Sequence, residues 1–136
     1  MSAYIKEHLG SKLPIRRVIS WSAPLSGSFL LWWAKERLRG WHEIITDKGV
    51  TREFCPSNPI TIDLRERMER TDAVSPTYFT ISGFCDFLVR PSSAMPHFVR
   101  AEHTKMLPHV GHFNIKVSLS AWKCVIEYLD EFMSTV

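Results

Sequence analysis

The sequence lacks long apolar runs. No stretch of its 136 residues is continuously apolar over the roughly 18 residues that a membrane-spanning helix requires. The first residues, from Met1 to His8, also lack the apolar core of a secretory signal peptide. We therefore expect neither a transmembrane segment nor secretion.

Cysteine is scarce and has no regular spacing. The chain contains 3 cysteines, Cys55, Cys85 and Cys124, which is an odd number without a C-x-x-C pair. A disulfide framework or a cysteine-rich zinc site would need a more regular pattern. The cysteines therefore favour a reducing compartment and predict a cytoplasmic protein.

Blocks of like charge are missing as well. Lys and Arg together number 17, Asp and Glu number 14, and the formal net charge is +3. The two signs are interleaved, as in Lys-Glu-Arg at residues 35–37 and Arg-Glu-Arg at residues 65–67, which is typical of solvated helix faces. Because the basic residues form only short pairs such as Arg16-Arg17, we expect no nucleic-acid partner.

What the chain does have is enough apolar material for one core. Hydrophobic residues make up 45% of the sequence, and its length falls within the range of a single globular domain. We therefore expect residues 1–136 to form one domain.

Three short segments are predicted to be strands. Residues 16–21 and 78–82 are rich in β-branched or aromatic residues, and Pro or Gly residues lie close to them. Residues 104–107 (TKML) form a briefer third strand that Pro108 closes. Helices are predicted between and around them, at residues 3–9, 29–39, 62–70 and 121–133, with a helical turn at 91–95. Residues 42–54 have the alternation and the central glycine of a β-hairpin.

This order of elements predicts an α/β domain. Strands separated by helices pair in parallel, so we expect about three parallel strands with flanking helices and a β-hairpin excursion. Ligand sites in such sheets lie beyond the carboxyl ends of the strands. The loops that hold residues 22–28, Asp86 and His112 should therefore meet at one edge.

Asp86 and His112 are the candidate catalytic residues. A serine hydrolase needs a histidine that takes up the proton of the nucleophile and a carboxylate that orients the imidazole. Both residues follow predicted strands, they occur in the order acid then base, and Gly111 permits a tight turn before the histidine.

Three ordered segments carry a resemblance to a known family. Residues 18–28 (VISWSAPLSGS) are similar to the strand and turn after the nucleophile helix of lipases, residues 78–89 to the strand and loop that bear the acid, and residues 107–114 (LPHVGHFN) to the histidine loop. The chain thus resembles the C-terminal half of an α/β-hydrolase of lipase or esterase type over about residues 17–133. The resemblance implies that Asp86 is the triad acid, that His112 is the general base and that the substrate is an ester or a lipid.

The sequence also departs from this family. No G-x-S-x-G nucleophile elbow occurs, and Ser26-Gly27-Ser28 follows a strand that resembles the next one along. The chain alone should therefore be inactive or nearly so. It would be a product of a split or truncated gene, a subunit completed by a chain that bears the serine, or a noncatalytic interaction module derived from the fold.

A sheet cut at this point would expose the strand at residues 18–21. Its unpaired N–H and C=O groups and apolar faces should be covered by self-association, by a partner chain or by rearranged local structure.

A metal site is a further interpretation, since four histidines occur in the last third of the chain: His97, His103, His109 and His112. His109 and His112 have a ligand-like spacing, but Pro108 and Gly111 argue against the helical face that would aim both rings at one ion. We therefore expect neither a metal nor a cofactor.

Overall fold

The computed structural model describes residues 2–9, 15–28, 30, 33, 37, 56–75 and 77–134. Its elements are α1 (Ser2–Leu9), β1 (Val18–Trp21), α5 (Pro59–Val74), β2 (Tyr78–Gly83), α6 (Pro91–Ala94), β3 (Thr104–Leu107) and α7 (Leu119–Ser134). Single 3-10 turns occupy Ala101–His103 and Ile115–Val117. The hairpin predicted at 42–54 lies outside the described residues, and so does the helix predicted at 29–39 except for positions 30, 33 and 37.

The strands form a parallel sheet in the order β1-β2-β3. Val18 pairs with Tyr78 at the start of β1, and Gly83 pairs with Leu107 at the end of β3. All three strands run in the same direction, because the segments between them contain helices and lead the chain from the end of one strand back to the amino end of the sheet. The predicted α/β arrangement of about three parallel strands with flanking helices is confirmed.

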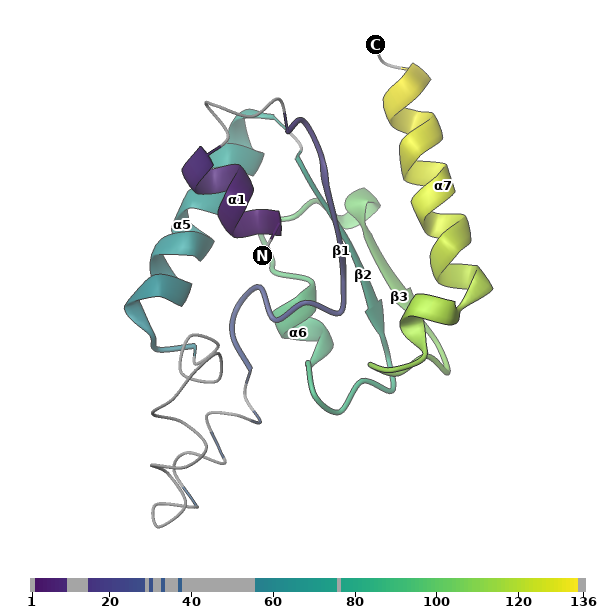
Figure 1. Cartoon of the computed structure of the whole chain (residues 1–136), viewed down its shortest axis with the longest axis horizontal. Helices are drawn as coiled ribbons and strands as arrows, with labels where there is room; N and C mark the ends of the chain where they lie inside the picture. The colour runs from purple at the N-terminus through teal and green to yellow at the C-terminus, as the bar shows by residue number, and fades with distance from the viewer. Residues whose placement is uncertain are drawn as a thin grey trace.

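Helices cover both faces of the sheet, with α1 and α5 on one side and α7 on the other (Figure 1). Successive side chains of a strand point to opposite faces. Ile19, Trp21, Phe79 and Ile81 accordingly pack toward α7, whereas Val18 belongs to the cluster on the α1 side.

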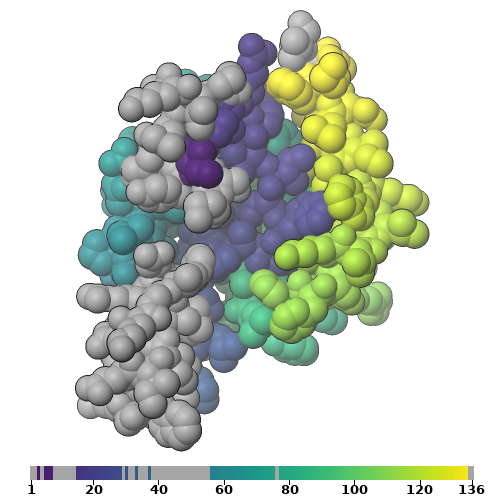
Figure 2. All heavy atoms as spheres, in the orientation of Figure 1, coloured from purple at the N-terminus to yellow at the C-terminus, as the bar shows by residue number. Residues whose placement is uncertain are grey.

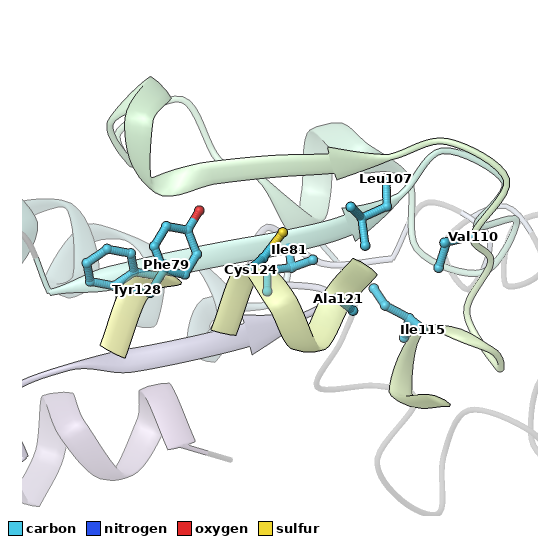
Figure 3. Close-up of a cluster of buried hydrophobic side chains, with 8 residues drawn as sticks. All are labelled: Phe79, Ile81, Leu107, Val110, Ile115, Ala121, Cys124 and Tyr128. Atoms are coloured by element: carbon cyan, nitrogen blue, oxygen red, sulfur yellow. The ribbon is translucent and has the colours of Figure 1, made fainter. Parts of the chain in front are cut away.

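The core beneath α7 is the larger of the two apolar clusters. Figure 3 shows its members: Phe79, Ile81, Leu107, Val110, Ile115, Ala121, Cys124 and Tyr128. They come from β2, β3, the loop after β3 and α7. Packing of this loop against α7 therefore fixes the position of the segment that contains His112. Burial of the side chains is what fixes this helix on the sheet.

Two carboxylates connect the helices on the opposite face to β2. Asp72 near the end of α5 accepts hydrogen bonds from the backbone N–H groups of Thr77 (2.7 Å) and Tyr78 (3.0 Å). Glu7 on α1 accepts hydrogen bonds from the hydroxyls of Thr71 (2.8 Å) and Tyr78. Burial, together with the bond to Glu7, raises the pKa of the Tyr78 hydroxyl.

Helix α5 is longer than the segment predicted at 62–70. Asn58 is its N-cap, since its side chain accepts a hydrogen bond from the N–H of Ile60 (2.8 Å), and Pro59 occupies the first turn. Both residue types favour a helix start at these positions. Within the described residues, no helix is long and apolar enough to cross a membrane.

Candidate active site

The loops that follow β2 and β3 are joined by their backbones at the carboxyl edge of the sheet. The N–H of Phe84 donates to the carbonyl of Leu107 (2.9 Å), and the N–H of Cys85 donates to the carbonyl of Val110 (3.0 Å). These bonds continue the parallel ladder beyond the strands. They bring the loop that carries Asp86 against the loop that carries His112.

The side chains of Asp86 and His112 form a hydrogen-bonded pair. Nδ1 of His112 lies 3.0 Å from Oδ2 of Asp86. The Asp86 side chain is fully buried, whereas 34% of the His112 side chain is exposed. The expected meeting of these two residues at one edge of the sheet is therefore present in the structure.

The other carboxylate oxygen of Asp86 is held by the backbone. Oδ1 accepts hydrogen bonds from the N–H groups of Leu88 (3.0 Å) and Val89 (2.8 Å). An oxygen that accepts two backbone N–H bonds is fixed in position. Asp86 thus presents Oδ2 to the imidazole in one orientation, and a proton on Nδ1 satisfies the contact.

Two glycines allow the loops to approach each other this closely. A Cβ at Gly83 would lie 2.2 Å from the carbonyl oxygen of Val110, and a Cβ at Gly111 would lie 3.1 Å from the carbonyl oxygen of Cys85. The tight turn predicted for Gly111 is not of the left-handed kind. His109 has that conformation instead, with φ of 60°.

The serines at the end of β1 are engaged elsewhere. Ser22 is buried with φ of 42°, and its Oγ accepts a hydrogen bond from the N–H of Gly83 at 3.4 Å. The hydroxyl of Ser28 donates to the carbonyl of Leu88 at 3.2 Å. Among the described residues, the hydrogen-bond partner of the His112 ring is Asp86, not a serine.

Exposed aromatic side chains lie in the same two loops as the pair. Phe84 and Phe87 flank Asp86 and are 67% and 88% exposed, and Phe113, which packs edge-on against His112, is 85% exposed. We call these three residues the phenylalanine rim. The exposure of these side chains could not be predicted from the sequence, although each phenylalanine lies within two residues of a candidate catalytic residue.

The remaining histidines of the last third make no hydrogen bond to Asp86 or His112 among the described residues. His103 is buried beside Phe79 and Tyr128 on the α7 face, whereas His97 and His109 are exposed. No group of three potential metal ligands occurs among the residues that the structure describes.

A cavity of about 650 Å³ lies at the opposite, amino end of the strands, with Lys6, Arg16, Arg17, Arg70, Thr77 and Phe132 in its lining. Because Asp86 and His112 lie at the carboxyl end, this cavity is not part of the candidate site. Comparison with known proteins supplies no family for the chain, since no family model, no curated protein and no solved structure matches it.

Proposed function

We propose that the chain is the C-terminal portion of a serine hydrolase of lipase or esterase type and supplies the acid and the histidine of its triad. The hydrogen bond between Asp86 and His112 carries this proposal. The carboxylate orients the ring and stabilises the imidazolium that forms when the histidine takes up a proton. With Nδ1 bound to Asp86, Nε2 is the nitrogen that accepts the proton of the attacking hydroxyl.

In this proposal the nucleophile comes from outside this chain, because the sequence has no G-x-S-x-G elbow. Ser22 and Ser28 bond to backbone groups of the β2 strand end and the loop after it, rather than to the imidazole. A triad without its nucleophile loses most of its rate acceleration. The isolated chain is therefore inactive in this proposal.

A serine-bearing strand would bind at the edge of β1 on which no described strand is paired. The N–H groups of Val18 and Ser22 bond to carbonyls on the β2 side, so Ile19 and Trp21 direct their backbone groups to the other side. Figure 2 shows the β1 region at the surface between the helices of the two faces. A parallel strand added there would end at the same edge as Asp86 and His112.

The phenylalanine rim indicates the class of substrate. Exposed aromatic side chains next to a general base favour an apolar group on the substrate, since burial of that group gives binding energy. The acyl chain of an ester or lipid has this chemistry.

The exposed Cys85 and the buried Cys124 are both free thiols, and we also propose a reducing, cytoplasmic compartment on this ground.

The first test uses the chain alone. We expect no labelling by a fluorophosphonate probe and no hydrolysis of p-nitrophenyl butyrate above the rate of the His112→Ala variant. Stoichiometric labelling of a serine would contradict the proposal. The variants Ser22→Ala and Ser28→Ala would then identify the labelled residue.

The second test restores the missing part. A segment with a G-x-S-x-G elbow, encoded upstream of Met1 or in an adjacent reading frame, would be co-expressed with this chain. Ester hydrolysis by the pair should disappear in Asp86→Ala and His112→Ala. Hydrolysis that survives both substitutions would show that the two residues are not part of the triad.

A noncatalytic interaction module is the second candidate function. The solvent exposure of the phenylalanine rim favours it as well, because a protein partner covers such residues as readily as an acyl chain does. The two candidates differ in the co-expression test. A module would bind its partner equally well with His112→Ala and would show no hydrolysis in any combination.

A further inference from the structure

The outer face of α7 carries a continuous apolar stripe. Its members recur at alternating spacings of three and four residues and are 47–80% exposed: Leu119, Trp122, Ile126, Leu129 and Met133. At about 100° per residue, they fall within an arc of roughly 80° on the helix surface. The face that packs on the sheet is a different one, formed by Ala121, Cys124 and Tyr128.

The spacing of the stripe is the heptad pattern of a helix pair. Large apolar residues at positions a and d of successive heptads form the seam between two helices. An exposed stripe of this length on a helix that is already fixed on a sheet indicates a protein partner rather than further packing within the domain. The stripe is therefore a candidate interface.

Charge at the border of the stripe selects the partner. Lys123 and Asp130 occupy the equivalent e positions on the polar side, and neither makes an ion pair with another described residue. In an antiparallel helix pair, e positions face e positions of the other helix. A two-fold axis between Ile126 and Leu129 then places Lys123 of each copy beside Asp130 of the other, so the surface is complementary to itself.

A parallel pair of α7 helices would have no such charge complementarity. There the e positions face g positions, which in α7 are Val125 and Phe132, and these side chains are half-buried against the domain. The antiparallel pair also places Ile126 opposite Leu129 and Trp122 opposite Met133, so that a positions pack on d positions. We propose that α7 is the interface of a homodimer, in which two copies of the stripe pack antiparallel about a two-fold axis between Ile126 and Leu129.

This inference does not depend on the proposed hydrolase function, because it uses neither the candidate active site nor the edge of β1. The Trp122 side chain is fixed in place for such a contact. Its indole N–H donates to the carbonyl of Lys116 (2.9 Å), and its ring packs edge-on against Trp21 at 4.8 Å between centroids. Fixing a large aromatic before binding lowers the entropy cost of association.

Sedimentation velocity of the full chain across the micromolar range tests the proposal. We expect a species of twice the 15.7 kDa chain mass. Ile126→Glu should give a monomer, since each introduced carboxylate would be buried in the apolar seam against Leu129 of the other copy. Ser120→Glu adds the same charge outside the stripe and should leave the dimer unchanged.

A charge exchange tests the antiparallel arrangement. Lys123→Glu and Asp130→Lys should each raise the dissociation constant about tenfold or more, because each places like charges opposite each other. The double variant should return to within about threefold of the original constant. Circular dichroism confirms that each variant is folded.

Three results would overturn the proposal. They are a monomer throughout the micromolar range, a dimer that persists with Ile126→Glu, and a double variant no tighter than its single variants. His112→Ala should leave the dimer intact, so loss of the hydrolase assignment and loss of this interface are distinguishable.

Discussion

Asp86 accepts hydrogen bonds at both of its carboxylate oxygens, and this division determines how the imidazole is held. Oδ1 is occupied by the N–H groups of Leu88 and Val89, which leaves Oδ2 for His112. The acceptor at Oδ2 selects the His112 tautomer that has its proton on Nδ1. The tautomer is therefore a property of the folded chain and can be observed without any catalytic activity.

Asp86→Asn should reverse that tautomer. The amide oxygen would keep the two backbone N–H bonds, so the NH₂ group would face His112 and donate to Nδ1, which moves the ring proton to Nε2. Long-range ¹H–¹⁵N spectra of the imidazole distinguish the two forms at a pH where the ring is neutral. An unchanged spectrum would mean that Asp86 does not determine the tautomer.

Asp86→Ala should cost more stability than Asp86→Asn. The alanine leaves the N–H groups of Leu88 and Val89 without their acceptor, and such groups are expensive when buried. We expect a loss of about 2–4 kcal/mol in the free energy of unfolding for Asp86→Ala, measured by urea denaturation, and a smaller loss for Asp86→Asn. Equal losses would contradict the role given to Oδ1.

The two described thiols should differ in reactivity. Cys85 is exposed, whereas Cys124 is buried on the side of α7 that packs on the sheet, and burial raises the pKa of its thiol. A higher pKa means less thiolate at neutral pH, and the thiolate is the form that reacts. Iodoacetamide should therefore alkylate Cys85 well before Cys124 in the folded protein, as followed by peptide mass spectrometry. Equal rates that persist below the unfolding transition would contradict this packing.

At the scale of elements, Gly83 couples the end of β2 to the histidine loop. Ala at this position would place its Cβ against the backbone of Val110, which cannot rotate away. Gly83→Ala should therefore lower the free energy of unfolding by about 2–3 kcal/mol and separate Asp86 from His112. Gly111→Ala meets only a tight contact and should cost less than about 1 kcal/mol.

Comparison of Gly83→Ala with Gly111→Ala separates two possible causes of a stability loss: reduced flexibility of the chain and steric contact of the new methyl group. Both substitutions add one methyl group to a loop, so they should be equivalent if only chain flexibility matters. Imidazole spectra and urea denaturation would measure the two effects together. A Gly83→Ala variant with native stability and an intact Asp86–His112 bond would refute the steric explanation.

The strands could be predicted because their information is local. Residues 78–82 are mostly β-branched or aromatic, and Pro76 and Gly83 lie close to their ends. Residues 104–107 end in two apolar residues directly before Pro108, so both segments are marked without reference to the rest of the chain. The true start of α5 was missed although Asn58 and Pro59 are a strong local signal, because the prediction followed apolar spacing instead. The need for glycine at position 83 could not be predicted, since it arises from a backbone far away in the sequence.

At the scale of the whole molecule, the convergence of Asp86 and His112 followed from topology. Once three parallel strands are assumed, their carboxyl ends must meet at one edge, and each candidate residue followed a strand. The sequence could not specify which atoms meet. The bonds from Leu88 and Val89 to Asp86 are local to one loop, but the contact of Oδ2 of Asp86 with Nδ1 of His112 and the exposure of the phenylalanine rim depend on how two loops fold against each other.

We also expect the chain to associate through the edge of β1, and this association is separate from the α7 dimer. The N–H of Ile19 points away from β2, toward the side on which no described strand is paired. Exposed edges of this kind promote association between chains. We therefore expect aggregates larger than the dimer at high concentration, measured by light scattering, and we expect Ile19→Pro to reduce them because proline removes an outward N–H group.

Ser20→Pro is the matched control for that substitution. Its N–H lies on the β2 side, by the alternation that places Val18 and Ser22 there, so proline at position 20 breaks the sheet and should unfold the domain. Ile19→Pro should remain folded and should keep the α7 dimer. If Ile19→Pro aggregates as readily as the original chain, association at high concentration does not use the β1 edge, and a serine-bearing strand would have to complete the sheet elsewhere.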